Sequence, residues 1–68
     1  MTQRQRHLFL AELALSGNTT FACAAARVTR AQALAERDGD PVFEREWRDA
    51  EAEARTGMLG RTSAAHTD

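Results

Sequence analysis

The sequence has 68 residues, of which 43% are apolar, and a formal net charge of −1. A chain of this length forms at most one domain, and because 14 of its residues are alanine, the core that it builds is thin and of a kind that usually needs a partner or a second copy. No stretch approaches the roughly 18 apolar residues of a membrane span and the N-terminus does not read as a secretory leader, so we expect a cytoplasmic protein without a membrane partner.

The small net charge hides two halves of opposite sign. Residues 1–37 contain five arginines and two acids, a net charge of +3, whereas residues 38–68 contain four arginines and eight acids, a net charge of −4. All nine basic residues are arginine, whose planar guanidinium suits phosphate and guanine contacts. The first half therefore suits an anionic partner, and the second half would repel one.

Nothing in the sequence predicts catalysis. The single cysteine, Cys23, cannot form an internal disulfide, and His7 and His66 are too isolated for a metal site, which would need about four ligands. The chain also has no phosphate-binding Gly-Lys-Ser/Thr loop and no nucleophile beside a base. We therefore predict that the protein is not an enzyme and binds no metal or cofactor.

The first helix is predicted over about residues 4–16. Leu8 and Leu13 belong to a broad apolar helical face, and Gly17-Asn18 supplies a stop. This helix is followed almost at once by a second one.

Two short helices are predicted next, separated by about three residues. The first runs to about Ala26, and its N-terminus is expected to be capped by one of three polar residues, Asn18, Thr19 or Thr20. The other begins after Thr29, because Thr29 and Gln32 have the spacing of a capping box, and it ends at about Arg37.

The last helix has the strongest start signal. Asp40 is an N-cap residue and Pro41 stands at the first helical position, where its missing N–H costs nothing. We expect the helix to end at Gly57, so that residues 4–57 form the domain and residues 58–68 form a flexible tail.

One apolar stripe runs along this last helix. It consists of Phe43, Trp47, Ala50 and Ala54, at spacings of four, three and four. We expect this stripe to pack over the first two helices as part of the core. An alternative is that it forms an exposed seam for a second copy or a partner protein.

The two short helices have the arrangement of a helix-turn-helix. Because such helices cross steeply, the first must offer small side chains at the contact, and Ala22, Cys23 and Ala26 meet that need. Val28 would fill the corner between them. The sequence thus predicts an all-α fold: a small four-helix helix-turn-helix domain with a longer C-terminal helix.

A family resemblance rests on several blocks between Phe9 and Ala54, about two thirds of the chain. These blocks are Phe9-Leu10, Leu13-Ala14, Gly17-Asn18-Thr19-Thr20, the alanine-rich stretch from Ala22 to Ala26, Val28-Thr29-Arg30, Asp40-Pro41-x-Phe43 and Trp47. In order and spacing they resemble the N-terminal DNA-binding domain of bacteriophage small terminase subunits and related prophage or gene transfer agent proteins.

The resemblance implies a protein that recognises double-stranded DNA, assembles into a homo-oligomer and delivers DNA to a large terminase subunit, which hydrolyses ATP during packaging. The chain departs from the family at three places. Arg27 stands at the turn position usually held by Gly, where a left-handed conformation would cost about 1 kcal/mol, so the turn could differ in shape. Glu36 replaces an aromatic or basic residue, and little chain follows the last helix for oligomerisation or for contact with the large subunit.

If the third helix enters the major groove, its first residues should reach the bases. The candidates for base contacts are Thr29, Arg30 and Gln32, with Arg30 suited to guanine and Gln32 to adenine. The candidates for phosphate contacts are Arg27, Arg37, Arg4 and Arg6. The negative charge of Glu36 would oppose phosphate.

Two alternatives to a packaging protein remain open on the sequence alone. One is a helical interaction module that binds a packaging or regulatory protein through its acidic last helix and has little affinity for DNA. The other is a small transcriptional regulator, because the sequence does not distinguish a packaging site from an operator.

Overall fold

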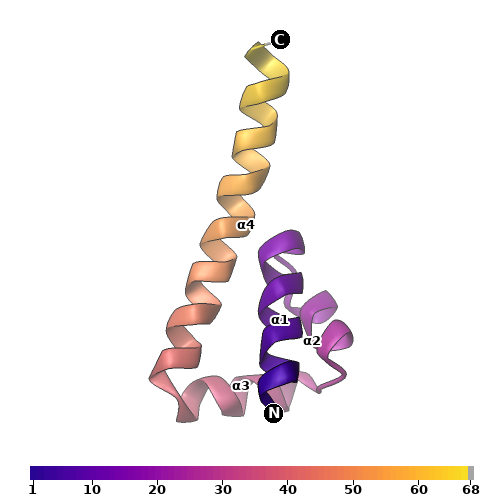
Figure 1. Ribbon diagram of the computed structural model, residues 1–68, viewed down its shortest axis with the longest axis vertical. Coiled ribbons are helices and arrows are strands. Elements are labelled where there is room, and N and C mark those ends of the chain that lie inside the picture. The colour runs from indigo at the N-terminus through magenta and orange to yellow at the C-terminus, as the bar shows by residue number, and fades with distance from the viewer. Residues whose placement is uncertain (68) are drawn as a thin grey trace.

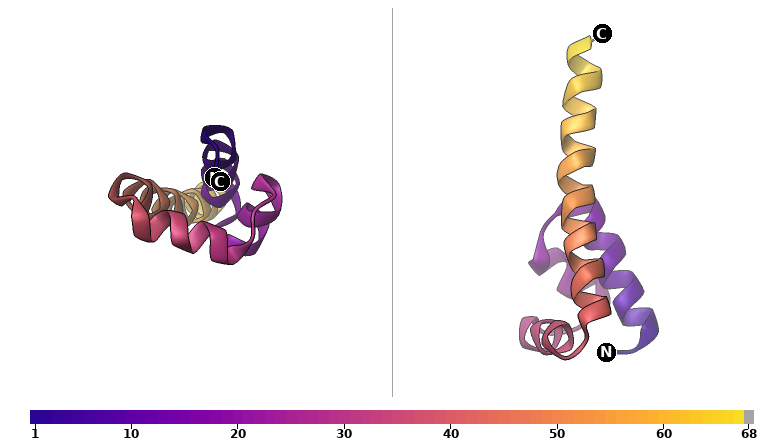
Figure 2. Two further views of the ribbon diagram at one scale, coloured as in Figure 1. Left: turned by 90° about the horizontal axis from the view of Figure 1, so that it is seen from below. Right: turned by 90° about the vertical axis from the view of Figure 1, so that its left-hand side faces the viewer.

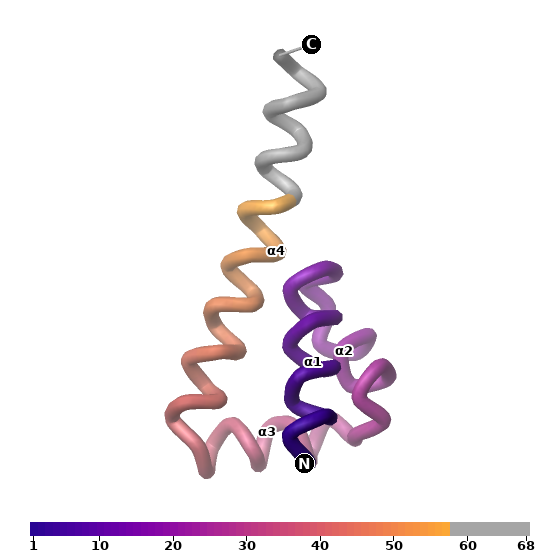
Figure 3. The backbone as a smooth tube through the Cα atoms, in the orientation of Figure 1, coloured from indigo at the N-terminus to yellow at the C-terminus, as the bar shows by residue number. Residues whose placement is uncertain are grey.

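The protein is described by a computed structural model, which covers the backbone of residues 1–67 and the side chains of residues 1–57 (Figure 3). Four helices follow one another in the order α1 (Gln3–Ser16), α2 (Thr19–Ala26), α3 (Arg30–Gly39) and α4 (Pro41–Thr67). Within this part of the chain there is no strand, so the predicted all-α fold is confirmed. None of these helices, over the residues described, is both long and apolar enough to cross a membrane.

Helices α1 and α4 lie side by side and run in the same general direction (Figure 1). Helix α2 packs against α1 on the side away from α4, and α3 crosses one end of the α1–α4 pair. Figure 2 shows that α2 and α3 both lie on one side of this pair. The other side of the α1–α4 pair is therefore not covered by α2 or α3.

Helix α1 begins one residue earlier than predicted, because Thr2 caps it. The Thr2 hydroxyl accepts from the Gln5 amide at 3.1 Å, and the Gln5 side chain accepts from the Thr2 amide at 2.8 Å, which completes a capping box. The helix ends at Gly17, whose left-handed φ of 65° suits a residue without a Cβ. A Cβ at Gly17 would lie 3.3 Å from the Ala54 Cβ, so α1 also ends in close contact with α4.

The core centres on three aromatic rings. The Phe9 ring lies 4.7 Å from that of Trp47 and 5.9 Å from that of Phe43, measured between centroids, and all three side chains are buried. Such tilted arrangements are favourable for aromatic pairs. Phe9 comes from α1 and the other two from α4, so the rings join the two long helices.

Small side chains fill the rest of the core where the helices approach closely. Buried beside the aromatic rings are Leu13, Ala22, Cys23, Ala26, Ala33 and Ala50. Val28 and Leu34 are partly buried against them. The small residues predicted for the contact between the two short helices, Ala22, Cys23 and Ala26, are therefore buried in the core.

The predicted interface stripe on α4 lies in this core. Phe43, Trp47, Ala50 and Ala54 are 0%, 3%, 6% and 2% exposed, respectively. Because the chain itself already covers these side chains, they are not available to a second copy or a partner. The exposed-seam interpretation of the stripe was therefore wrong, and the core interpretation is confirmed.

Helix α4 starts as predicted but does not stop at Gly57. Asp40 accepts from the amides of Val42 at 2.9 Å and Phe43 at 3.3 Å, which caps the helix. The predicted end at Gly57 was wrong, because helical backbone continues to Thr67. The prediction of a flexible tail concerns residues 58–68, whose side chains are not among those that the structure describes.

Candidate nucleic-acid interface

A turn of residues 27–29 joins α2 to α3 and forms a tight corner. The amide of Val28 donates to the Cys23 carbonyl at 3.0 Å, and that of Arg27 donates to the Ala24 carbonyl at 3.2 Å. This pair of bonds is a Schellman motif, which satisfies carbonyls at the end of α2 and requires a left-handed residue at the turn. The helix-turn-helix corner is thus closed by backbone hydrogen bonds.

Arg27 is the left-handed residue of this motif, with φ 58° and ψ 44°. The sequence alone left the shape of this turn open, and in the structure Arg27 adopts the left-handed conformation that is costly for a residue with a Cβ. Its side chain is exposed and takes part in no ion pair among the described residues. Arg30, at the first position of α3, is likewise exposed and unpaired within that part of the chain.

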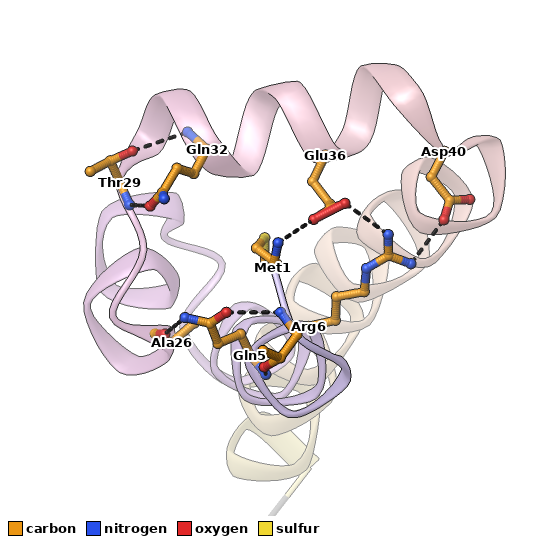
Figure 4. A network of polar contacts seen from close by, with 9 residues as sticks. Met1, Gln5, Arg6, Ala26, Thr29, Gln32, Glu36 and Asp40 are labelled. Carbon is orange, nitrogen blue, oxygen red and sulfur yellow. Dashed lines mark hydrogen bonds and ion pairs between the residues drawn. The ribbon is translucent and has the colours of Figure 1, made fainter.

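Arg4 joins Arg27 at a surface hollow between the start of α1 and the end of α2. The hollow has a volume of about 440 Å³, and both arginines line it together with Leu8 and Ala26. The Gln5 side chain donates to the Ala26 carbonyl at 3.4 Å and so connects the two helices at this point (Figure 4). Two arginines that are far apart in the sequence therefore border the same depression.

Two polar residues at the start of α3, Thr29 and Gln32, cap this helix. The Thr29 hydroxyl accepts from the Gln32 amide at 3.0 Å, and the Gln32 side-chain oxygen accepts from the Thr29 amide at 2.8 Å (Figure 4). Bidentate recognition of adenine needs both the oxygen and the nitrogen of a glutamine side chain. While the cap is formed, Gln32 cannot make that bidentate contact, and the Thr29 hydroxyl keeps its O–H donor and one lone pair for another partner.

The outer face of α3 offers few other groups for base recognition. Besides Arg30 it exposes Ala31, Ala35 and Asp38. Alanine can contact a thymine methyl group but forms no side-chain hydrogen bond. Arg30 is therefore the only candidate base reader from the sequence that has an exposed side chain not engaged in capping.

Arg6 was expected to contact phosphate, but the structure places it in an internal network. Its guanidinium donates to Glu36 at 2.9 Å and to Asp40 at 2.8 Å (Figure 4), and it lies 5.1 Å from the centroid of the Phe43 ring. The side chain thereby links α1 to α3 and to the start of α4. Because its donors are turned inward, we correct its assignment from a DNA contact to a structural contact.

Glu36 was expected to oppose phosphate, but its charge is compensated within the chain. The ammonium group of Met1 lies 2.7 Å from one carboxylate oxygen, and Arg6 contacts the other. The pKa of Glu36 is lowered, first by the hydrogen bond from the Met1 ammonium and then by that from Arg6. Asp40 also has a lowered pKa, mainly because of Arg6 and then the Phe43 amide, and these carboxylates raise the pKa of Arg6, with Glu36 contributing first.

Arg37, the remaining phosphate candidate, packs against the core. Its guanidinium carbon lies 4.9 Å from the centroid of the Trp47 ring, and the side chain is half-buried. A cation held over a tryptophan in this way stabilises the contact between α3 and α4. Of the seven candidates from the sequence, the structure leaves three exposed and unpaired within the described residues, namely Arg4, Arg27 and Arg30.

Within the described residues, no three His, Cys, Asp or Glu side chains gather closely enough to hold a metal ion. Comparison with protein-family models, with curated proteins and with solved structures finds no match for this chain.

Proposed function

We propose that this protein binds duplex DNA through the α2–α3 corner, with α3 against the major groove. The observation that carries the proposal is the exposure of Arg27 and Arg30 on either side of a closed helix-turn-helix turn, without internal ion pairs in the described residues. Arg4 adds a third guanidinium beside Arg27. Exposed guanidinium groups at this corner would meet the phosphate backbone of a duplex.

The proposed binding is dominated by phosphate contacts and has little sequence preference. Thr29 and Gln32 cap α3 instead of facing a groove, and Ala31 and Ala35 offer no hydrogen bonds. Any base preference would come from Arg30, which suits the edge of guanine.

Fluorescence anisotropy with a labelled duplex over a salt series tests the proposal. We expect the intact chain to bind at about 50 mM salt with a Kd below about 100 μM, the range of non-specific duplex binding. Each phosphate contact adds about 0.9 to the slope of log K against log salt concentration, so the R27Q/R30Q double variant should lose about 1.8 from that slope.

The matched control is R45Q/R55Q, which removes the same charge from exposed arginines on the acidic helix α4. We expect this control to bind with the wild-type slope, and circular dichroism should confirm that both variants fold. Absence of binding by the wild-type chain, or equal loss in the two double variants, would refute the proposed interface.

For the biological role we propose a DNA-packaging protein of the small terminase type, acting in the cytoplasm as a homo-oligomer with a large terminase subunit as its partner. This part rests on the sequence resemblance described above. Light scattering on the purified chain tests the oligomer, and co-purification with a large terminase subunit tests the partner. A strict monomer that fails to retain such a subunit would contradict this role while leaving DNA binding open.

A further inference from the structure

A groove runs between α1 and α4 on the side of the molecule that α2 and α3 leave uncovered. Its volume is about 430 Å³. Leu10 and Ala14 of α1 and Ala50 of α4 line it, and each of these side chains is partly or fully buried. All three side chains are apolar, so the groove floor is apolar. Because two of them are alanine, the backbone of another helix can approach the floor closely.

The α4 edge of the groove is acidic. Glu46, Asp49 and Glu53 recur at spacings of three and four and all line the groove, so they form a row of carboxylates along one edge of the helix. Their side chains are exposed, and none takes part in an ion pair among the described residues. This row is called here the acidic rim. His7 of α1 lines the same groove, and an adjoining hollow places Arg6 near Glu46, so the unpaired part of the rim is centred on Asp49 and Glu53.

The groove continues toward the end of α1. A second hollow of about 330 Å³ shares Ala14 and Glu53 with the first and extends it to Leu15 and Gly57. Leu15 is 75% exposed, the largest exposed fraction among the large apolar side chains described. The two hollows together make one continuous depression with an apolar floor, an acidic rim and an exposed leucine at one end.

We propose that this groove is a docking site for a basic amphipathic helix of another protein. The apolar stripe of such a helix would lie on Leu10, Ala14 and Leu15, and lysines or arginines beside the stripe would face the acidic rim. The charge of the rim selects this occupant, because opposite potentials favour association. The same carboxylates repel the phosphates of nucleic acid and of anionic lipid.

The docking site and the proposed DNA surface lie on different sides of the molecule. The groove is lined by α1 and α4 alone, whereas α2 and α3 lie on the opposite side of that pair (Figure 2). The protein could therefore hold a duplex and a basic helix at the same time. The docking proposal does not depend on DNA binding, because it rests on separate residues.

A fluorescent peptide titration tests the proposal with the full chain. The probe is an 18-residue helical peptide with leucine and alanine on one face and lysine on both flanks, and the control probe has glutamate in place of each lysine. We expect the basic probe to bind and the acidic probe not to bind. The D49K/E53K variant should bind the basic probe at least about tenfold more weakly, since two attractive pairs become repulsive.

The control variant is E51K/E44K, which makes the same charge change on α4 at residues outside the groove lining and also removes the exposed Glu44–Arg48 ion pair. It should retain affinity to within about threefold, and circular dichroism should show that both variants fold. Equal losses in the two variants, or binding of the acidic probe as well, would overturn the groove as the site. Absence of binding of the basic probe would also overturn the proposal. If the chain self-associates and D49K/E53K abolishes that self-association, the occupant of the groove is a second copy and the proposal is overturned as well.

DNA anisotropy on the same variants separates this proposal from the proposed function. D49K/E53K should bind duplex at least as well as the wild-type chain, because it removes negative charge. The R27Q/R30Q variant should bind the basic probe with wild-type affinity. Loss of peptide binding in R27Q/R30Q would overturn the separation of the two surfaces.

Discussion

At the scale of the residue, Arg27 combines an unfavourable backbone conformation with an exposed cation. Its φ of 58° would suit glycine, yet its guanidinium is available at the corner between α2 and α3. A side chain with a Cβ costs about 1 to 2 kcal/mol in this conformation. The position therefore gives up stability and gains a charge at the proposed DNA surface, as functional sites often do.

Replacement of Arg27 by glycine separates these two effects. We expect R27G to raise the free energy of unfolding by about 0.5 to 1 kcal/mol, because the relief of strain exceeds the extra entropy of glycine in the unfolded chain. Urea denaturation measures the change. The control A25G, inside α2, should instead lose about 1 kcal/mol. An R27G protein less stable than the wild type would show that the arginine side chain makes a stabilising contact.

The network formed by the Met1 ammonium, Arg6 and the carboxylates of Glu36 and Asp40 predicts a specific dependence of stability on pH. Folding holds the pKa of Glu36 below its ordinary 4.5 and that of Asp40 below its ordinary 3.8. The unfolded chain therefore takes up protons first as the pH falls, so the stabilisation is fully present above pH 4.5 and is lost as the pH falls through the lowered values of the folded state. Arg6 stays charged throughout this range and adds no dependence of its own.

Thermal melts between neutral pH and about pH 3 measure this effect. The wild-type Tm should fall on acidification, and R6M, which keeps an apolar side chain beside Phe43, should show a lower Tm at neutral pH and a shallower fall. The control R45M removes an exposed arginine from α4 and should retain the wild-type profile. Parallel profiles for R6M and wild type would mean that the network around Arg6 does not stabilise the fold.

At the scale of the element, each helix start is set by a short local pattern. Thr29 with Gln32 and Asp40 with Pro41 were readable from the sequence, because a cap depends only on residues three or four positions apart. The same pattern in Thr2 and Gln5 was missed, although it could have placed the start of α1 correctly. Local capping chemistry thus accounts for the helix starts of this fold.

The helix ends were harder to predict, for two physical reasons. Helix α3 continues to Gly39, two residues past the predicted end, because its stop comes from Asp40, which is held in an extended conformation before Pro41. Gly57 does not end α4, since a glycine inside a helix costs only about 1 kcal/mol and does not by itself provide a left-handed turn. Gly17, by contrast, has the left-handed φ that ends α1.

The internal network could not be predicted from spacing. Arg6 lies 30 residues from Glu36 and 34 from Asp40, so their contact exists only once α1, α3 and α4 are assembled. In the sequence alone, Arg6 could not be distinguished from an exposed arginine, and Glu36 was expected to repel phosphate. The sequence therefore predicted the corner between α2 and α3, but not which of the candidate side chains are engaged in contacts within the chain.

Substitution of Thr29 tests whether this residue is a cap or a DNA contact. As a cap, T29A should lower the free energy of unfolding by about 1 kcal/mol and leave the salt slope of DNA binding unchanged. Urea denaturation and anisotropy on the same protein measure the two quantities, and T2A serves as a capping control at α1. A T29A protein of wild-type stability with weakened DNA binding would return Thr29 to the interface.

At the scale of the whole molecule, the fold sorts the two charged halves of the sequence onto different sides. The exposed arginines of the corner belong to the first half, with its net charge of +3, and the acidic rim belongs to the second half, with its net charge of −4. Arg6 and Arg37 are half-buried and bind other parts of the chain, through Glu36 and Asp40 and through Trp47, respectively. A polyanion would therefore be oriented toward the α2–α3 corner before any specific contact forms.

The most direct test of the central claim is an NMR titration of the labelled chain with a short duplex. We expect the backbone amides of residues 27–30 and the guanidinium signals of Arg4, Arg27 and Arg30 to shift most, while the amides of residues 46–53 stay in place. Shifts centred on residues 46–53, or unchanged signals at residues 27–30 in the presence of excess duplex, would contradict that claim.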